Sequence, residues 1–190
     1  MAILKKVANI TKELFMEKEV ASYIRSIKDF PKQGIIFRDI TTVLQDPEAL
    51  KLAIDSMQSK LEGVDFDLVV GPEARGFLFG VPIAYNSGVG FVPIRKKGKL
   101  PSETVEETYD LEYGSATIEV HKDGIKPGDK VVIIDDLLAT GGTTKAMVNL
   151  VEKLGGQVVR IVCLIELCGL KGRDLVPGYS VETVVQYPGA

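Results

Sequence analysis

Short apolar runs separated by polar residues predict the strands of a sheet. Residues 130–134 are mainly apolar and β-branched, which is typical of a strand covered on both faces in a parallel sheet. Similar runs occur at residues 66–70, 89–94 and 158–165. Residues 117–121 alternate between polar and apolar side chains, which predicts a strand near the sheet edge with one polar face.

Apolar stripes at helical spacing lie between these runs. The clearest begins at Asp46-Pro47, a capping residue followed by proline at the first helical position, and ends at Gly63. The others cover residues 16–27, 77–85 and 146–154. Because strands alternate with helices, the chain is predicted to form an α/β fold with a doubly wound, mainly parallel sheet.

Two segments lack such periodicity. Residues 30–34, Phe-Pro-Lys-Gln-Gly, interrupt the first helical pattern and predict an irregular loop. Residues 96–108 are rich in charge, Gly, Pro and Thr, so we expect a mobile loop there. Since no repeat or linker divides the 190 residues, we expect one domain over residues 16–190 and a possible N-terminal extension over residues 1–15.

Composition excludes several classes of function. A net charge of −3 gives no general electrostatic surface for nucleic acid, and no apolar run approaches the roughly 20 residues that a membrane span needs. The first residues lack the apolar core of a secretory signal, and Cys163 and Cys168 fit neither a zinc pair nor a disulfide framework. We therefore expect a cytoplasmic protein that binds neither nucleic acid nor a membrane.

The strongest chemical signal follows the buried run at residues 130–134. Ligands of open parallel sheets bind beyond the carboxyl ends of the strands, which is where Asp135-Asp136 stands. Adjacent carboxylates repel each other, and their burial lowers stability unless they meet hydroxyl groups or a cation. The acidic pair therefore predicts a ligand.

The turn after the acidic pair is suited to phosphate. Gly141 and Gly142 let the backbone approach a ligand, and Thr140, Thr143 and Thr144 supply hydroxyl groups at the start of a helix. An ordinary capped turn is the alternative, although such a turn needs only one of these residues. The ending of an ATP-binding P-loop and a Gly-x-Gly-x-x-Gly dinucleotide motif are both missing from the sequence, so a phosphorylated ribose is the predicted ligand.

These residues also carry a family resemblance. Residues 131–143, Val-Val-Ile-Ile-Asp-Asp-Leu-Leu-Ala-Thr-Gly-Gly-Thr, resemble the phosphoribosyl pyrophosphate motif of the type I phosphoribosyltransferases, most closely its adenine-specific members. Residues 30–40 resemble the family's base-binding hood, residues 71–77 its pyrophosphate loop, and residues 95–114 its flexible catalytic loop. The resemblance covers about residues 19–187, in the expected order.

The resemblance implies a fold and a reaction. The fold is the type I phosphoribosyltransferase fold, an α/β fold whose mainly parallel central sheet is flanked by helices, with a small hood over about residues 30–45 and a flexible catalytic loop. The reaction converts adenine and phosphoribosyl pyrophosphate to AMP and pyrophosphate. Mg²⁺ would be held mainly by substrate oxygens rather than by protein ligands, and the protein would form a homodimer.

The resemblance also implies which residues bind the sugar and its phosphates. Ribose and the 5-phosphate would be bound by Asp135, Asp136, Ala139, Thr140, Gly141, Gly142 and Thr143. Pyrophosphate would be bound by Glu73, Ala74, Arg75, Arg95, Lys96 and Lys99.

Adenine binding and catalysis are implied in the same way. Adenine would be bound by Ile36, Phe37, Arg38, Leu137 and Tyr113. The catalytic residues would be Glu112, as the acid or base for a purine proton, together with Arg75 and Lys99.

Each role has a simpler alternative in the sequence. Arg75 could be a surface arginine, the basic run at residues 95–99 a solvated loop, and Glu112 a carboxylate facing water. The substrate base could be another purine, such as xanthine. A non-catalytic regulator that senses phosphoribosyl pyrophosphate is the other alternative, although residues 1–15 are too few for a DNA-binding domain.

Overall fold

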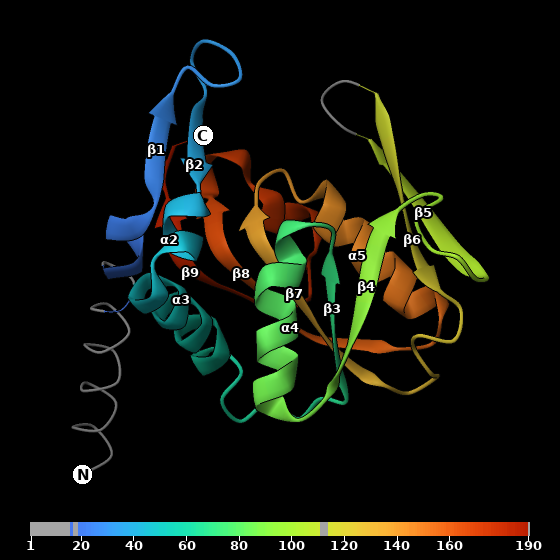
Figure 1. The fold of residues 1–190 in the computed structure, drawn as a ribbon. Helices are drawn as coiled ribbons and strands as arrows, with labels where there is room; N and C mark the ends of the chain where they lie inside the picture. Colours follow the sequence, from blue (N-terminus) through green and yellow to red (C-terminus); the bar gives the residue numbers. More distant parts are fainter. Residues whose placement is uncertain (1–15, 17–18, 111–113, 190) are drawn as a thin grey trace.

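A seven-stranded sheet forms the centre of the computed structural model, which describes residues 16, 19–110 and 114–189 (Figure 1). In spatial order the strands are β5 (Thr104–Asp110), β6 (Ser115–His121), β4 (Gly90–Lys96), β3 (Leu68–Pro72), β7 (Lys130–Leu138), β8 (Gln157–Leu167) and β9 (Val181–Tyr187). Neighbouring strands from β4 to β9 run parallel, whereas β6 is antiparallel to both β4 and β5. The predicted α/β fold with a mainly parallel sheet is confirmed.

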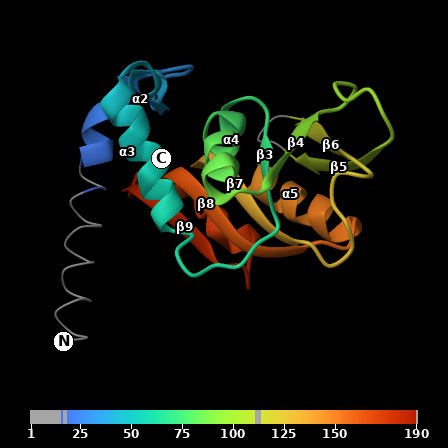
Figure 2. The same ribbon diagram turned by 60° about the horizontal axis from the view of Figure 1, so that its bottom comes forward.

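Helices cover both faces of the sheet (Figure 2). The long helices are α3 (Pro47–Ser59), α4 (Arg75–Ser87) and α5 (Gly142–Lys153). Strand β7 packs against both layers, because Val132 and Ile134 face the apolar cluster of α3 and α4 while Val131 and Ile133 face that of α5. All four side chains are fully buried, which explains why this strand is apolar without alternation.

A small hood precedes the sheet in the sequence. It consists of β1 (Arg25–Lys28), β2 (Ile36–Asp39) and α2 (Thr41–Gln45), and its two strands are antiparallel. Asp39 joins the three elements, since its carboxylate accepts hydrogen bonds from the Thr41 amide at 2.9 Å and from the Arg25 Nε at 3.0 Å. The Thr41 amide, followed by the Arg25 guanidinium, lowers the pKa of Asp39 to about 2.

The hood corrects one prediction. The helix expected over residues 16–27 is helical at residues 19–23, and a strand has begun by Arg25. Arg25 is opposite Asp39 in the strand pair, 14 residues away, and this long-range partner overrides the local helical pattern. The proposed extension, residues 1–15, lies outside the described residues.

The hairpin of β5 and β6 corrects a second prediction. The mobile loop expected over residues 96–108 is a connection only at residues 97–103, because β5 pairs with β6 along its whole length. Sequence periodicity missed β5 because its partly buried positions include the polar residues Thr104 and Glu107. The sequence therefore shows no clear alternation of apolar and polar residues. In Figure 1 the hood and this hairpin project from the same end of the sheet, where β7 and β8 finish.

The order of the strands creates a crevice between β3 and β7. The chain passes from β3 through α4 to β4 on one side, and later from β7 through α5 to β8 on the other side. This reversal of direction is a topological switch point, where the ends of adjacent strands separate and leave room for a ligand. The fold therefore places the residues after Pro72 and Ile134 in one crevice.

The remaining elements match the sequence in part. Asp46 caps α3 as predicted, accepting hydrogen bonds from the amides of Glu48 and Ala49, both at 2.9 Å. Strand β9 and the two short 3₁₀ helices η1 (Cys168–Leu170) and η2 (Gly172–Leu175) were not predicted. Among the helices that the structure describes, none has the length and apolar character needed to cross a membrane.

Candidate active site

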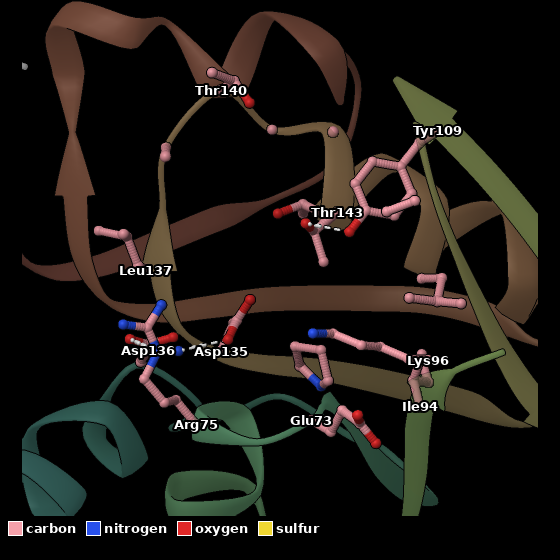
Figure 3. Close-up of a pocket in the computed structure, with 17 residues that line it drawn as sticks. Glu73, Arg75, Ile94, Lys96, Tyr109, Asp135, Asp136, Leu137, Thr140 and Thr143 are labelled. Carbon is pink, nitrogen blue, oxygen red and sulfur yellow. Dashed lines mark hydrogen bonds and ion pairs between the residues drawn. The ribbon is translucent and has the colours of Figure 1, made fainter. Parts of the chain in front are cut away.

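Two adjacent carboxylates stand at the carboxyl end of β7, beside the crevice (Figure 3). Asp135 and Asp136 are 7% and 4% exposed. The Arg75 Nε lies 3.0 Å from Oδ2 of Asp136, and Oδ1 of Asp135 accepts a hydrogen bond from the Asp136 amide at 2.8 Å. One partly exposed cation therefore faces two buried acidic groups.

Burial makes this pair difficult to ionise. It raises the pKa of Asp135 well above the ordinary carboxyl value, and the charge of Asp136 acts in the same direction. Burial also raises the pKa of Asp136, while Arg75 opposes the shift. Hydroxyl groups of a bound sugar would stabilise the charged carboxylates by hydrogen bonding, so the pair is suited to a diol.

The turn after β7 is shaped by contacts between backbones. Gly141 has a φ of +87°, in the left-handed region that favours glycine, and a Cβ on it would lie 2.3 Å from the carbonyl oxygen of Gly172. A Cβ on Gly172 would likewise lie 2.3 Å from the carbonyl oxygen of Ala139. Helix α5 begins at Gly142 with no side-chain cap from the described residues, so its first amides are available to an anion.

An ion pair between Arg173 and the buried carboxylate of Glu166 holds Gly172 against that turn. Arg173 donates from Nε and Nη2 to the two carboxylate oxygens of Glu166, both at 2.7 Å, and from Nη1 to the Val181 carbonyl oxygen at 2.6 Å. Glu166 is 4% exposed, and its hydrogen bonds to Arg173 lower its pKa. The pair ties η2 to β8 and β9, which supports the phosphate turn from behind.

The turn from β3 to α4 packs closely on the end of β7. A Cβ on Gly76 would lie 2.4 Å from Cδ of Pro72, and a Cβ on Gly71 would lie 2.9 Å from the carbonyl oxygen of Ile134. The peptide between Glu73 and Ala74 is cis. Arg75, the first residue of α4, is thereby brought beside the acidic pair.

The basic run after β4 is anchored through its backbone. Arg95 pairs through Nε with Glu73 at 2.6 Å and donates from Nη1 to the carbonyl oxygen of Lys99 at 3.0 Å. Buried Glu119 accepts hydrogen bonds from the amides of Lys99 and Leu100, both at 2.9 Å. Burial alone would raise the pKa of Glu119, but the amide hydrogen bonds lower it below its usual value. The backbone of the turn is fixed, whereas the Lys99 side chain is exposed.

Comparison with known proteins shows which family the chain belongs to. The phosphoribosyl transferase domain family matches residues 39–186. A protein of Lachnoclostridium phytofermentans named adenine phosphoribosyltransferase is 63% identical over 172 residues, which is 90% of this chain and 99% of that protein. The chain belongs to the adenine phosphoribosyltransferase family.

Solved adenine phosphoribosyltransferases share the fold. The structure from Thermoanaerobacter pseudethanolicus has a TM-score of 0.87 and 53% identity, covering 90% of this chain and 99% of that one. The structure from Saccharomyces cerevisiae, complexed with adenine and an imino-altritol bisphosphate, has a TM-score of 0.84 and 38% identity, covering 90% and 99%. The type I phosphoribosyltransferase fold expected from the sequence is confirmed.

A cavity of about 290 Å³ occupies the crevice of this adenine phosphoribosyltransferase fold (Figure 3). It collects most of the residues expected to bind ribose and phosphates, together with one residue expected to contact adenine. They are Glu73, Arg75, Lys96, Asp135, Asp136, Leu137, Ala139, Thr140, Gly141, Gly142 and Thr143.

Other expected site residues do not line the cavity. They are Ala74, Arg95, Lys99, Ile36, Phe37 and Arg38, whereas Glu112 and Tyr113 lie outside the described residues. The Arg38 guanidinium lies over the ring of Tyr187, 3.7 Å from its centroid, so this side chain joins the hood to β9. The Phe37 ring makes an edge contact with Phe30, with 5.3 Å between centroids. The side chains of Phe37 and Arg38 thus already contact other residues, Phe30 and Tyr187.

Tyr109 is a cavity residue that the assignment of site residues omitted. It projects from β5 toward the phosphate turn, where Thr143 Oγ1 donates a hydrogen bond to its hydroxyl oxygen at 3.0 Å (Figure 3). The alternation of partly buried Val105, Glu107 and Tyr109 could have indicated this strand. Both the composition of residues 96–108 and the resemblance to the adenine phosphoribosyltransferase family had assigned the segment to a flexible loop.

The raised pKa of Asp135 predicts a pH-dependent stability difference for Asp135→Asn. A carboxyl group that binds its proton more tightly in the folded chain lowers stability as the pH rises from the unfolded pKa through the folded one. Without ligand, the melting temperature of the variant should therefore match wild type near pH 3–4 and exceed it increasingly at higher pH, by about 2–4 °C per kcal/mol for a chain of this size.

Thermal melts between acid and neutral pH measure this difference. Asp123→Asn, at an exposed aspartate in the turn after β6, is the matched control for the substitution itself. Equal pH dependence for the two variants would contradict the assignment to burial of Asp135.

Proposed function

We propose that the protein transfers the phosphoribosyl group of phosphoribosyl pyrophosphate to adenine, forming AMP and releasing pyrophosphate in purine salvage. The observation that carries this proposal is the buried Asp135-Asp136 pair, followed directly by a phosphate turn at the switch point of the sheet. Membership of the adenine phosphoribosyltransferase family supports adenine as the base.

Ribose binding is assigned to the acidic pair. The ribose hydroxyl groups donate to Asp135 and Asp136, while the 5-phosphate is held by the turn from Ala139 to Thr143 and the first amides of α5. The bond between the anomeric carbon and pyrophosphate breaks with its electron pair leaving on pyrophosphate, and a purine nitrogen bonds to that carbon. The ionised carboxylates stabilise the positive charge that develops on the sugar.

Pyrophosphate binding is assigned to the part of the cavity lined by the turn from β3 to α4 and by the end of β4. Arg75 and Lys96 supply positive charge there, Glu73 lines the same part of the cavity, and the adjoining backbone at Ala74 is assigned to pyrophosphate with them. Arg95 acts through its pair with Glu73 and its bond to the Lys99 carbonyl oxygen, and Lys99 extends its ammonium group from that anchored turn. Together these cations neutralise the leaving group.

Adenine binding is assigned to the hood and the end of β7. Ile36, Phe37 and Arg38 contact the base mainly through their backbone, since the Phe37 ring packs on Phe30 and the Arg38 guanidinium on Tyr187. Leu137 packs against the purine ring. The family resemblance adds Tyr113 as a base contact and Glu112 as the group that handles the purine proton.

Magnesium is proposed to enter with the substrate. In the part of the chain that the structure describes, no three His, Cys, Asp or Glu side chains gather as a metal site. Oxygens of ribose and pyrophosphate would therefore supply most of the ligands, and the ion would offset charge on the leaving group. We further assign residues 16–190 to one catalytic domain with residues 1–15 as an extension, and place the enzyme in the cytoplasm.

A substrate panel tests the reaction and the base. With phosphoribosyl pyrophosphate and Mg²⁺, adenine should exceed hypoxanthine, guanine and xanthine in kcat/KM by roughly 100-fold or more, because a site built for one hydrogen-bonding edge rejects the others. Removal of Mg²⁺ should abolish turnover. Preference for a 6-oxopurine would overturn the base, and ligand binding without turnover of any base would favour the regulator instead.

Lys99→Ala should separate catalysis from folding. Loss of one charged contact to pyrophosphate should lower kcat/KM for phosphoribosyl pyrophosphate roughly 10- to 100-fold. The melting temperature should change little, because the Lys99 side chain is exposed and the contacts of its backbone remain. Lys97→Ala, at an exposed lysine paired with Glu106, is the control and should retain activity. A large fall in melting temperature for Lys99→Ala would contradict this role.

A homodimer is proposed from an apolar stripe on α4. Leu78, Val81 and Tyr85 are 44%, 49% and 85% exposed and share one face at helical spacing. In Figure 1 this helix lies in front of the sheet, and no other described element covers its outer face. Exposed apolar residues in a row indicate a contact surface, and a second copy of the chain is the proposed occupant.

Val81→Glu should convert the dimer to monomers. Glutamate is a good helix former, so α4 should persist while a charge disrupts the stripe. Light scattering should give the mass of one chain for this variant and of two for wild type. Leu175→Glu, at a leucine on η2 that is 47% exposed, should remain dimeric. A monomeric wild type, or an unchanged Val81→Glu, would exclude this surface.

A further inference from the structure

Strand β5 is fastened to α5 at the edge of the cavity. Its residues Val105, Glu107 and Tyr109 alternate with exposed residues and therefore share one face. Glu107 accepts a hydrogen bond from Nδ2 of Asn149 at 2.6 Å and forms an ion pair with Lys153. These contacts hold β5 against α5, the helix that follows the phosphate turn. They thereby position Tyr109, the next residue on this face of the strand.

Tyr109 lies directly on the phosphate turn. A Cβ on Gly142 would be 3.2 Å from Cδ2 of the Tyr109 ring, so the ring packs on the first residue of α5. Thr143 Oγ1 donates to the Tyr109 hydroxyl oxygen at 3.0 Å, and both residues line the cavity (Figure 3). The Tyr109 hydroxyl group therefore lies beside Gly142 and Thr143, at the start of α5 where the anion is proposed to bind.

The hydrogen bond from Thr143 leaves the phenolic proton free. A tyrosine hydroxyl group can accept and donate at the same time, and here the oxygen accepts. Within residues 19–110 and 114–189, no acceptor for the Tyr109 proton is found. A donor beside free amides at a helix start is suited to an oxyanion, and donation to a charged oxygen is stronger than to a neutral one.

We propose that Tyr109 is a ligand of the 5-phosphate, accepting from Thr143 and donating its own proton to a phosphate oxygen. The inference rests on the proposed function and adds to it a contact from outside the phosphate turn. Because Tyr109 belongs to β5, the same anion is held by the turn after β7 and by a strand of the hairpin. Occupancy of the phosphate turn then also positions the C-terminal end of β5.

Tyr109→Phe tests this contact with little change in shape. The ring keeps its packing on Gly142, so the melting temperature should stay near that of wild type, while the phosphate loses one donor. Calorimetric titration with ribose 5-phosphate should show a Kd about tenfold higher. In steady state, KM for phosphoribosyl pyrophosphate should rise by about the same factor, with KM for adenine within about twofold of wild type.

Tyr179→Phe is the matched control. The Tyr179 hydroxyl group donates to Glu152, and Tyr179 does not line the cavity, so this variant should bind ribose 5-phosphate as wild type does. An unchanged Kd for Tyr109→Phe, an equal loss in both variants, or an equal rise in KM for adenine would each overturn the role of Tyr109. A wild-type protein that neither binds ribose 5-phosphate nor forms AMP would overturn the proposed function itself.

Discussion

The structure depends on an unfavourable arrangement at the end of β7, where two adjacent carboxylates are buried and, among the described residues, Arg75 is the cation paired with them. A purely structural core would replace such a pair with apolar residues, because burying like charges lowers stability. The surrounding elements hold both carboxylates in this position. The crevice between β3 and β7 exposes the carboxylates to a ligand, while the apolar residues of β7 below them are covered on both sides.

The turn after β7, to which we assign the 5-phosphate, is supported by residues outside the cavity. Gly141 and Gly172 bring two backbones into contact, and only glycine permits an approach this close. Arg173 and Glu166 then hold the second backbone on the sheet. The turn gains rigidity from behind, so its amides can remain directed at the anion without a side-chain cap from the described residues.

The two projecting parts of the molecule are anchored by different chemistry. The hood is held by Asp39, whose carboxylate joins two strands and a helix, and by the Arg38 guanidinium on the ring of Tyr187. The hairpin is held by Glu107 on α5, while Glu119 of the hairpin fixes the basic turn that follows β4. Polar contacts thus add to the apolar packing of Ile40 and Val43 in the hood and of Ile118 and Val120 in the hairpin, and together they position the parts that surround the crevice.

The sequence alone determined the α/β class, the buried strand, the acidic pair and the phosphate turn, because each depends on neighbours within about ten residues and on local rules of burial and backbone conformation. Tertiary structure decided what depends on distant partners. Arg25 joins a strand because Asp39 lies across from it, and Glu119 is buried because it caps a turn about 20 residues away. Arg38 is turned onto Tyr187, and Tyr109 reaches Thr143, because the fold brings together residues far apart in the chain, which no local pattern records.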